Sequence, residues 1–180
     1  MAMDRDSSRS ALVDVLKTAY SGERAAADAY HGHWKSVRDP EERERIRTIE
    51  EEELHHRRQV GAMLQKLGER PSRGREARAA LIGGALNLFC RVAPWFLPMY
   101  GAGRLESGNI KEYEAAARYA RDYGCIEFVD CLLTQAEVEW EHEKYFRSKV
   151  ESHPWSRRFP MWEQPPPKET IRASFAQESV

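Results

Sequence analysis

The chain has 180 residues, of which 41% are hydrophobic and 32% charged, and this suits a globular protein with a sizeable, helix-rich core. Its formal net charge is −1 and its pI is about 6.6. Proteins that bind nucleic acid usually carry a strongly basic face, so we expect no nucleic-acid partner. The three cysteines show no C-x-x-C spacing, which argues against a zinc ribbon or an appended rubredoxin-type iron site. Their odd number, without a signal peptide at the N-terminus, favours the cytoplasm.

A polar stretch over residues 1–9, which we expect to fray, precedes the first predicted helix. This helix runs from about Ala11 to Val37, with Ser10 as its N-cap. One of its faces, sampled every three or four residues, is apolar except for Glu23. The members of that face are Leu12, Leu16, Ala19, Glu23, Ala27, Tyr30 and Trp34. A carboxylate on a buried face requires a partner, either a cation or a metal ion.

A second predicted helix begins at Pro40, after the break at Asp39, and ends before Gly68. Its inward face contains Ile46, Ile49, Glu53, His56, Val60, Met63 and Leu67. Glu53 and His56 are spaced i and i+3, so they lie one above the other on the face that should be buried. Glu52 and His55 have the same spacing but belong to a polar face. The phase of the helix therefore selects Glu53 and His56.

Residues 79–103 form a long apolar stretch that contains Pro94 and Pro98. By length it could span a bilayer, but Asn87, Arg91 and the prolines argue against a membrane span. We expect a buried helix followed by a proline-broken junction. The alternative is an apolar hairpin that lies on a membrane or lines a channel for an apolar substrate.

Two further helices are predicted over about Pro98–Tyr123 and Ile126–Val150, separated by Gly124. The inward face of the first contains Met99, Ala102, Glu106, Ile110, Tyr113, Ala117 and Ala120. That of the second contains Phe128, Leu132, Gln135, Glu139, His142, Phe146 and Val150. Glu139 and His142 repeat the i, i+3 pair of the second helix. The flanking acids, among them Glu143, are expected to face mostly outward.

The composition changes after His153, where prolines and tryptophans become frequent. We therefore predict two parts, a helical bundle over residues 1–153 and a Pro/Trp-rich tail over 154–180. The prolines exclude a regular helix over His153–Thr170. Trp155, Phe159 and Trp162 could attach this tail to the bundle or to a neighbouring subunit.

Four helices thus each place metal-binding residue types at an inward position near their middle. Two helices contribute a single glutamate, and two contribute Glu-x-x-His. The set is Glu23, Glu53, His56, Glu106, Glu139 and His142. Four carboxylates and two histidines in this order are the ligand set of ferritin-like di-iron or di-manganese proteins. Four carboxylates offset the charge of two divalent ions, and imidazole suits iron better than magnesium or calcium. Taken singly, each residue fits an ion pair or a satisfied core histidine. Tyr30 and Tyr113 share these faces, either as core aromatics that bond to the ligand carboxylates or as radical relays.

The chain resembles the ferritin-like di-iron carboxylate superfamily over about Leu12 to Val150. Its N-terminal half is most similar to the demethoxyubiquinone hydroxylase family of ubiquinone biosynthesis. This resemblance rests on Gly22-Glu23 followed by Tyr30 and Gly32, on Glu53-x-x-His56 and on Arg70-Pro71. Glu139-Trp140-Glu141-His142 resembles the E-x-E-H motif of the family, and residues 79–103 lie where the family has its membrane-contacting hairpin. The resemblance implies that the six residues above are iron ligands.

The fold class expected is therefore all-α, a ferritin-like four-helix bundle with an extra apolar helical segment between helices two and three and a Pro-rich C-terminal tail. The function expected is a non-haem di-iron, or iron–manganese, O₂-activating oxidoreductase that hydroxylates an apolar substrate. A ferroxidase, a rubrerythrin-like peroxide scavenger and a non-enzymatic bundle are the alternatives. Expected partners are a small apolar substrate, O₂ or peroxide, a membrane surface at residues 79–103 and a second copy of the chain in a homodimer. The expected location is the cytoplasm, with peripheral membrane contact as a further option.

Overall fold

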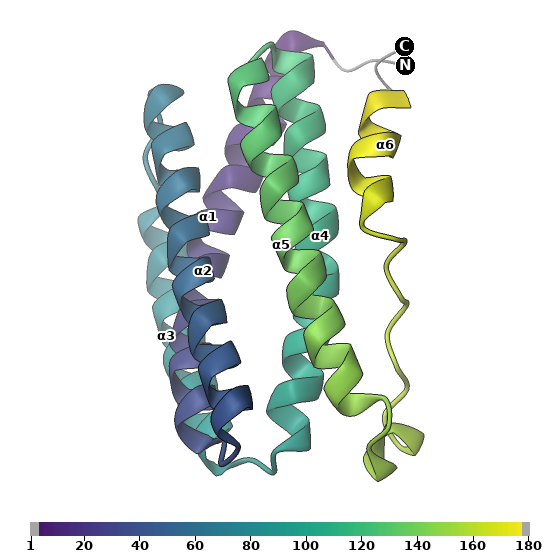
Figure 1. Ribbon diagram of the computed structural model, residues 1–180. Coiled ribbons are helices and arrows are strands. Elements are labelled where there is room, and N and C mark those ends of the chain that lie inside the picture. Colours follow the sequence, from purple (N-terminus) through teal and green to yellow (C-terminus); the bar gives the residue numbers. More distant parts are fainter. Residues whose placement is uncertain (1–3, 178–180) are drawn as a thin grey trace. The chain divides into compact units, whose positions relative to one another are not determined.

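The computed structural model describes residues 4–177, and every regular element within that range is a helix. In chain order the elements are α1 Arg5–Ser36, α2 Pro40–Lys66, α3 Arg73–Val92, α4 Phe96–Tyr123, α5 Ile126–Val150, the short 3-10 helix η1 Pro154–Arg157 and α6 Glu169–Gln177 (Figure 1). The predicted all-α fold class is confirmed, including the additional helix α3 between the second and third predicted bundle helices. Contacts divide the chain into two compact units. The N-terminal unit is Val13–Pro98, and the described part of the C-terminal unit combines residues 4–12 with residues 99–177.

The start of α1 differs from the prediction. The helix begins at Arg5 and not near Ala11, because Asp4 caps it. Its carboxylate accepts hydrogen bonds from the backbone N–H groups of Asp6 and Ser7, at 3.1 and 3.0 Å. Aspartate is a favoured N-cap because it satisfies N–H groups that have no partner within the helix. The predicted N-cap, Ser10, lies inside α1, and of the stretch predicted to fray only residues 1–3 fall outside the described range.

The other helix ends follow the sequence signals. Asp39 caps α2 and accepts from the backbone N–H of Glu42 at 2.9 Å, and Pro40 occupies the first turn, where a missing N–H costs nothing. Gly68 and Gly124 follow α2 and α4 with φ of 72° and 100°. Only glycine adopts this left-handed conformation without strain, so both residues suit the ends of helices.

In the N-terminal unit, α3 packs very closely against α1. A Cβ atom added at Gly32 of α1 would overlap the backbone of Asn87 on α3, and one added at Gly83 would lie 2.7 Å from the Cβ of Asp28. The Asn87 side chain also donates to the backbone carbonyl of Asp28 at 2.7 Å. The two glycines therefore permit the close approach of the helices.

The two faces of α3 differ in burial. Ala79, Gly83 and Cys90 are buried, whereas Leu81, Leu88 and Val92 are 75%, 63% and 74% exposed. The expectation of a buried helix is therefore wrong for this second face, because α3 has an apolar side that residues 4–177 do not cover. Within residues 4–177, no helix combines the length and the hydropathy needed to cross a membrane.

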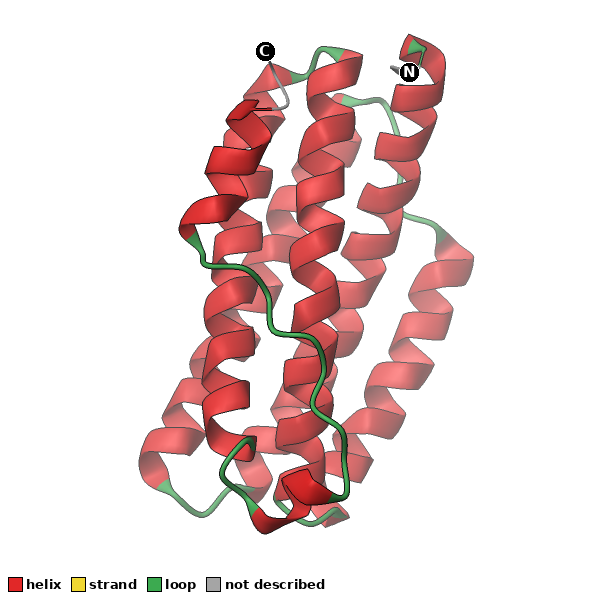
Figure 2. Ribbon diagram, turned by 90° about the vertical axis from the view of Figure 1, so that its right-hand side faces the viewer, coloured by secondary structure: helices red, strands yellow, loops and turns green. Residues whose placement is uncertain are grey.

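In the C-terminal unit, α4 and α5 form an antiparallel pair, and residues 154–177 run alongside as a segment that we call the C-terminal strap (Figures 1 and 2). The Tyr100 hydroxyl of α4 donates to the carbonyl of Pro160 at 2.6 Å, and the Trp162 indole donates to Glu143 of α5 at 2.7 Å. Trp162 also lies against Gly103, where a Cβ atom would be 2.5 Å from the indole ring. At the far end of the strap, α6 was not predicted, since the prolines before it dominated the pattern.

Candidate metal centre

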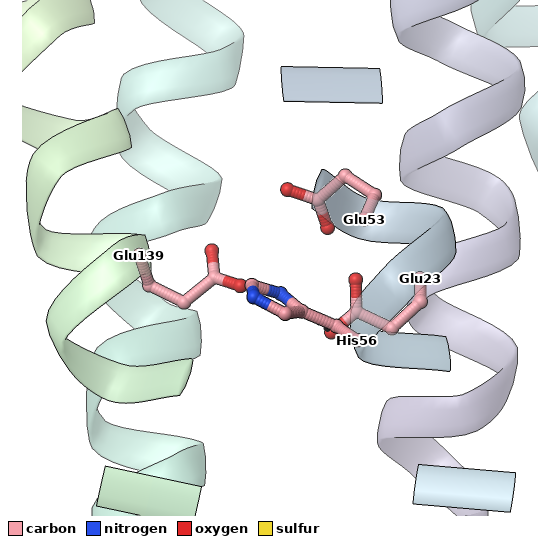
Figure 3. Close-up of side chains that lie close together, drawn as sticks. All are labelled: Glu23, Glu53, His56 and Glu139. Carbon is pink, nitrogen blue, oxygen red and sulfur yellow. Dashed lines mark ion pairs between the residues drawn. The ribbon is translucent and has the colours of Figure 1, made fainter. Parts of the chain in front are cut away.

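The first group of candidate ligands lies within the N-terminal unit. Glu23 comes from α1, and Glu53 and His56 come from α2, where the i, i+3 spacing places both on one face (Figure 3). Their exposed fractions are 4%, 0% and 3%. One potential ligand atom of each residue lies within 4.8 Å of those of the other two. The His56 Nδ1 atom is 4.0 Å from Glu23 Oε1. We call these three residues the N-terminal triad.

The second group lies within the C-terminal unit and repeats the same residue types. Glu106 comes from α4, and Glu139 and His142 come from successive turns of α5. They are 1%, 0% and 0% exposed, and their potential ligand atoms again lie within 4.8 Å of one another. The His142 Nδ1 atom is 3.6 Å from Glu139 Oε2. We call these residues the C-terminal triad. The predicted burial of all six candidates is thus confirmed.

The residues present in each triad fit a divalent metal ion. Two carboxylates and one imidazole are donors that suit iron and manganese. Metal–ligand bonds of about 2.0–2.2 Å leave the ligand atoms of one ion roughly 3–4 Å apart. The separations within each triad are close to this range, so small side-chain rotations would be enough to enclose an ion. Each triad therefore has the composition and the burial of half of a dinuclear site.

A buried glutamate outside the triads shows what an ordinary ion pair looks like in this protein. Glu143 of α5 is 2% exposed, and its Oε1 atom accepts from Arg147 at 2.7 Å and from the Trp162 indole at 2.7 Å. A guanidinium supplies the positive charge here, as buried carboxylates require. Glu143 was expected to face mostly outward. That expectation is wrong because the C-terminal strap covers it.

The other residues singled out from the sequence are buried close to the same helix faces. Tyr30 and Tyr113 are 5% and 2% exposed, and Gln135, one turn before Glu139, is 1% exposed. The Tyr30 ring stacks on that of His33, with the ring centroids 6.4 Å apart. A role for either tyrosine beside the ligands stays a prediction.

Two polar residues that the structure places in buried or partly buried positions were not identified from the sequence, Asn109 of α4 and His33 of α1. Asn109 of α4 donates to Glu106 Oε2 at 2.9 Å and lies 3.4 Å from Glu139 Oε2. Its position three residues after Glu106 was a usable signal, but the contact with α5 was not visible in the sequence. His33 of α1 is 2% exposed, and burial lowers its pKa to about 4, so the imidazole is neutral at pH 7. In the sequence it stood beside the predicted inward face and not on it.

Comparison with known proteins supports the resemblance seen in the first half of the chain. Residues 10–90 match the family model described as Ubiquinone biosynthesis protein COQ7. The match covers most of α1, all of α2 and most of α3, and therefore includes the whole N-terminal triad. No curated protein and no solved structure matches the chain. The predicted similarity to the demethoxyubiquinone hydroxylase family, within the ferritin-like superfamily, is thereby confirmed for the N-terminal half of the chain.

Proposed function

We propose that Glu23, Glu53, His56, Glu106, Glu139 and His142 together bind two iron ions, with manganese as the alternative metal, and that the protein is an O₂-dependent oxidoreductase. The observation that carries this proposal is the repetition of one triad, Glu plus Glu-x-x-His, buried in each of the two units. Six ligands of these types in this order are the dinuclear set of ferritin-like proteins. Four carboxylates balance the four positive charges of two divalent ions, so that the ions need no further counter-charge.

The proposed reaction is hydroxylation of an apolar, quinone-class substrate. The support is the family match, whose description names ubiquinone biosynthesis. Two bound iron ions would supply the activation of O₂. The protein's own contribution is to hold the six donor groups in a dry environment, since each is at most 4% exposed. Tyr30 and Tyr113 are proposed to orient ligand carboxylates through their hydroxyl groups.

A membrane is the proposed source of this substrate, reached through the outer face of α3. Leu81, Leu88 and Val92 follow helical spacing and are all more than 60% exposed. Exposed apolar faces of this kind mark interaction sites. Arg78 and Arg91 are exposed on the same helix and would attract anionic headgroups. The helix would therefore lie in the interface and not cross the bilayer.

Vesicle flotation tests this contact. Replacement of Leu81, Leu88 and Val92 by serine should abolish flotation with vesicles of phosphatidylethanolamine and phosphatidylglycerol. Leu105 and Ile126 are similarly exposed, at 63% and 62%, but belong to the other unit. Their replacement by serine is the matched control and should leave flotation intact. Equal loss in both variants, or no flotation of the wild-type protein, would rule out docking through α3.

Metal analysis tests the proposed centre. Protein purified without added metal should contain two iron ions, or one iron and one manganese, per chain. The Glu53→Ala, Glu139→Ala double variant, which removes one carboxylate from each triad, should lose both. Glu143→Gln removes the charge of a buried glutamate outside the triads and should retain the metal. Wild-type protein without bound metal after reconstitution would refute the proposal.

Oxygen and oligomer measurements separate the related functions. The iron-loaded protein should consume O₂ and develop ferric absorption. Rapid turnover of peroxide without any organic substrate would instead identify a peroxide scavenger. We propose a homodimer in solution, which light scattering tests, whereas a closed shell of many copies would favour iron storage.

A further inference from the structure

The two triads have the same ligand types but differ at the position three residues after the single glutamate. In the C-terminal triad, the position three residues after the single glutamate is Asn109. In the N-terminal triad, the corresponding position after Glu23 is Ala26. Residues spaced i, i+3 share a helix face, so both positions lie next to the ligand on its own helix. At this helix position the C-terminal triad therefore has an amide side chain, and the N-terminal triad has a methyl group.

The Asn109 side chain connects ligands from two helices. Its Nδ2 atom is 2.9 Å from Glu106 Oε2 on α4 and 3.4 Å from Glu139 Oε2 on α5. The amide nitrogen carries two hydrogens, one for each carboxylate. The opposite orientation would turn the amide oxygen toward two groups that only accept hydrogen bonds, so the contacts fix the direction of the amide. Asn109 thus joins the two carboxylates before any ion is present.

This contact has two consequences for metal binding. Carboxylates brought close together repel one another, and a shared donor offsets part of that repulsion. The donor also holds both groups in a fixed position, so less conformational freedom is lost when an ion binds. Each carboxylate oxygen has two lone pairs, so acceptance of the amide hydrogen leaves a lone pair for the metal. At the corresponding position of the N-terminal triad, the side chain of Ala26 has no polar atom.

We propose that Asn109 is a positioning residue that makes the two metal positions unequal, so that the C-terminal triad fills first with a divalent ion. The inference rests on the proposed function, because it requires that the triads bind metal. It adds an order of loading and assigns that order to one residue outside the six ligands.

Titration of the metal-free, full-length protein with Co²⁺, followed by its visible absorption and by calorimetry, tests this inference. Wild type should bind two ions in two resolved steps. Asn109→Ala should weaken the tighter step by about 10- to 100-fold, the usual effect of removing a group that orients metal ligands. The weaker step should not change. Asn109→Leu, which keeps the bulk but loses the donor, should behave in the same way, and thereby separates hydrogen bonding from packing.

Two further variants make the result specific. Asn87→Ala removes another asparagine that bonds between helices, through its 2.7 Å contact with the Asp28 carbonyl, and should leave both steps unchanged. His56→Ala removes a ligand from the N-terminal triad. The tighter Co²⁺-binding step should persist in this variant, and Asn109→Ala should still weaken it. Two Co²⁺ steps that are identical in wild type and in both Asn109 variants would overturn the inference and leave the proposed function standing. A wild-type protein that binds no Co²⁺ would overturn both.

Discussion

Two adjacent glycines of α3, Gly83 and Gly84, provide a direct test of the packing of this helix against α1. A Cβ atom at Gly83 would lie 2.7 Å from Asp28 Cβ and 3.0 Å from Ala25 Cα, whereas one at Gly84 would meet nothing within 4 Å. Both residues lie inside the same helix, so replacement by alanine brings each the same gain in helix propensity, about 0.5–1 kcal/mol. Only the first replacement forces a methyl group against a neighbouring helix. Overpacking of this kind typically costs about 1–3 kcal/mol.

The two effects predict opposite signs. Gly84→Ala should raise the free energy of unfolding by about 0.5–1 kcal/mol, and Gly83→Ala should lower it by about 0.5–2 kcal/mol once the propensity gain is subtracted. In a chain of this size, 1 kcal/mol corresponds to roughly 2–4 °C in Tm. The two variants should therefore melt on opposite sides of wild type in circular dichroism at 222 nm. Equal stabilisation by both would show that α3 does not pack against Ala25 and Asp28, and would refute the reasoning.

Three further predictions concern single side chains. Burial lowers the pKa of His33 from 6.5 to about 4. As the pH falls from about 6.5 to 4, this histidine is therefore protonated in the unfolded chain but not in the folded protein, and the free energy of unfolding decreases. The loss should reach about 2 kcal/mol at pH 5. His33→Phe should lack this component when melting at pH 7 and pH 5 is compared with wild type, and an unchanged pH dependence would contradict it. Trp162→Phe removes the 2.7 Å hydrogen bond to Glu143 and should cost about 1–3 kcal/mol in urea unfolding. Trp140→Phe removes an exposed hydrogen bond to the backbone carbonyl of Pro166, at 2.8 Å, and should cost less. Burial raises the pKa of the Cys90 thiol to about 11. Iodoacetamide at pH 8 should therefore leave Cys90 unmodified in the folded protein and alkylate it after denaturation. Rapid modification in the folded state would mean that α3 separates from α1.

Helix phase was the part of the structure that the sequence predicted best. Spacings of three and four residues correctly placed Glu53 and His56 on the buried face of α2. They also correctly placed Glu52 and His55 outside that face. The same pattern on α5 correctly identified Glu139 and His142. This success has a physical basis, since periodicity depends only on local geometry, which every helix shares.

Contacts between distant segments were not predictable in the same way. Glu143 lies one residue after His142, and its burial depends on Trp162, which is 19 residues away in the chain. Asn109 reaches Glu139 across 30 residues. The outer face of α3 was misjudged for a related reason. Apolar composition predicts that a helix has a partner, but it does not specify whether that partner belongs to the same chain.

The weak attachment of the C-terminal strap has a consequence for local opening. Within residues 154–177 only Ile171 is buried, and the side chain of Arg172, which forms ion pairs with Asp130 and Glu137, is 43% exposed. Segments with so few buried contacts open at a lower free-energy cost than the helices beneath them. Amide hydrogens of the strap should therefore exchange with solvent faster than those of α4 and α5. Each such opening would admit water to the Glu143 carboxylate, the side chain next to His142, while the helices that carry the C-terminal triad remain folded.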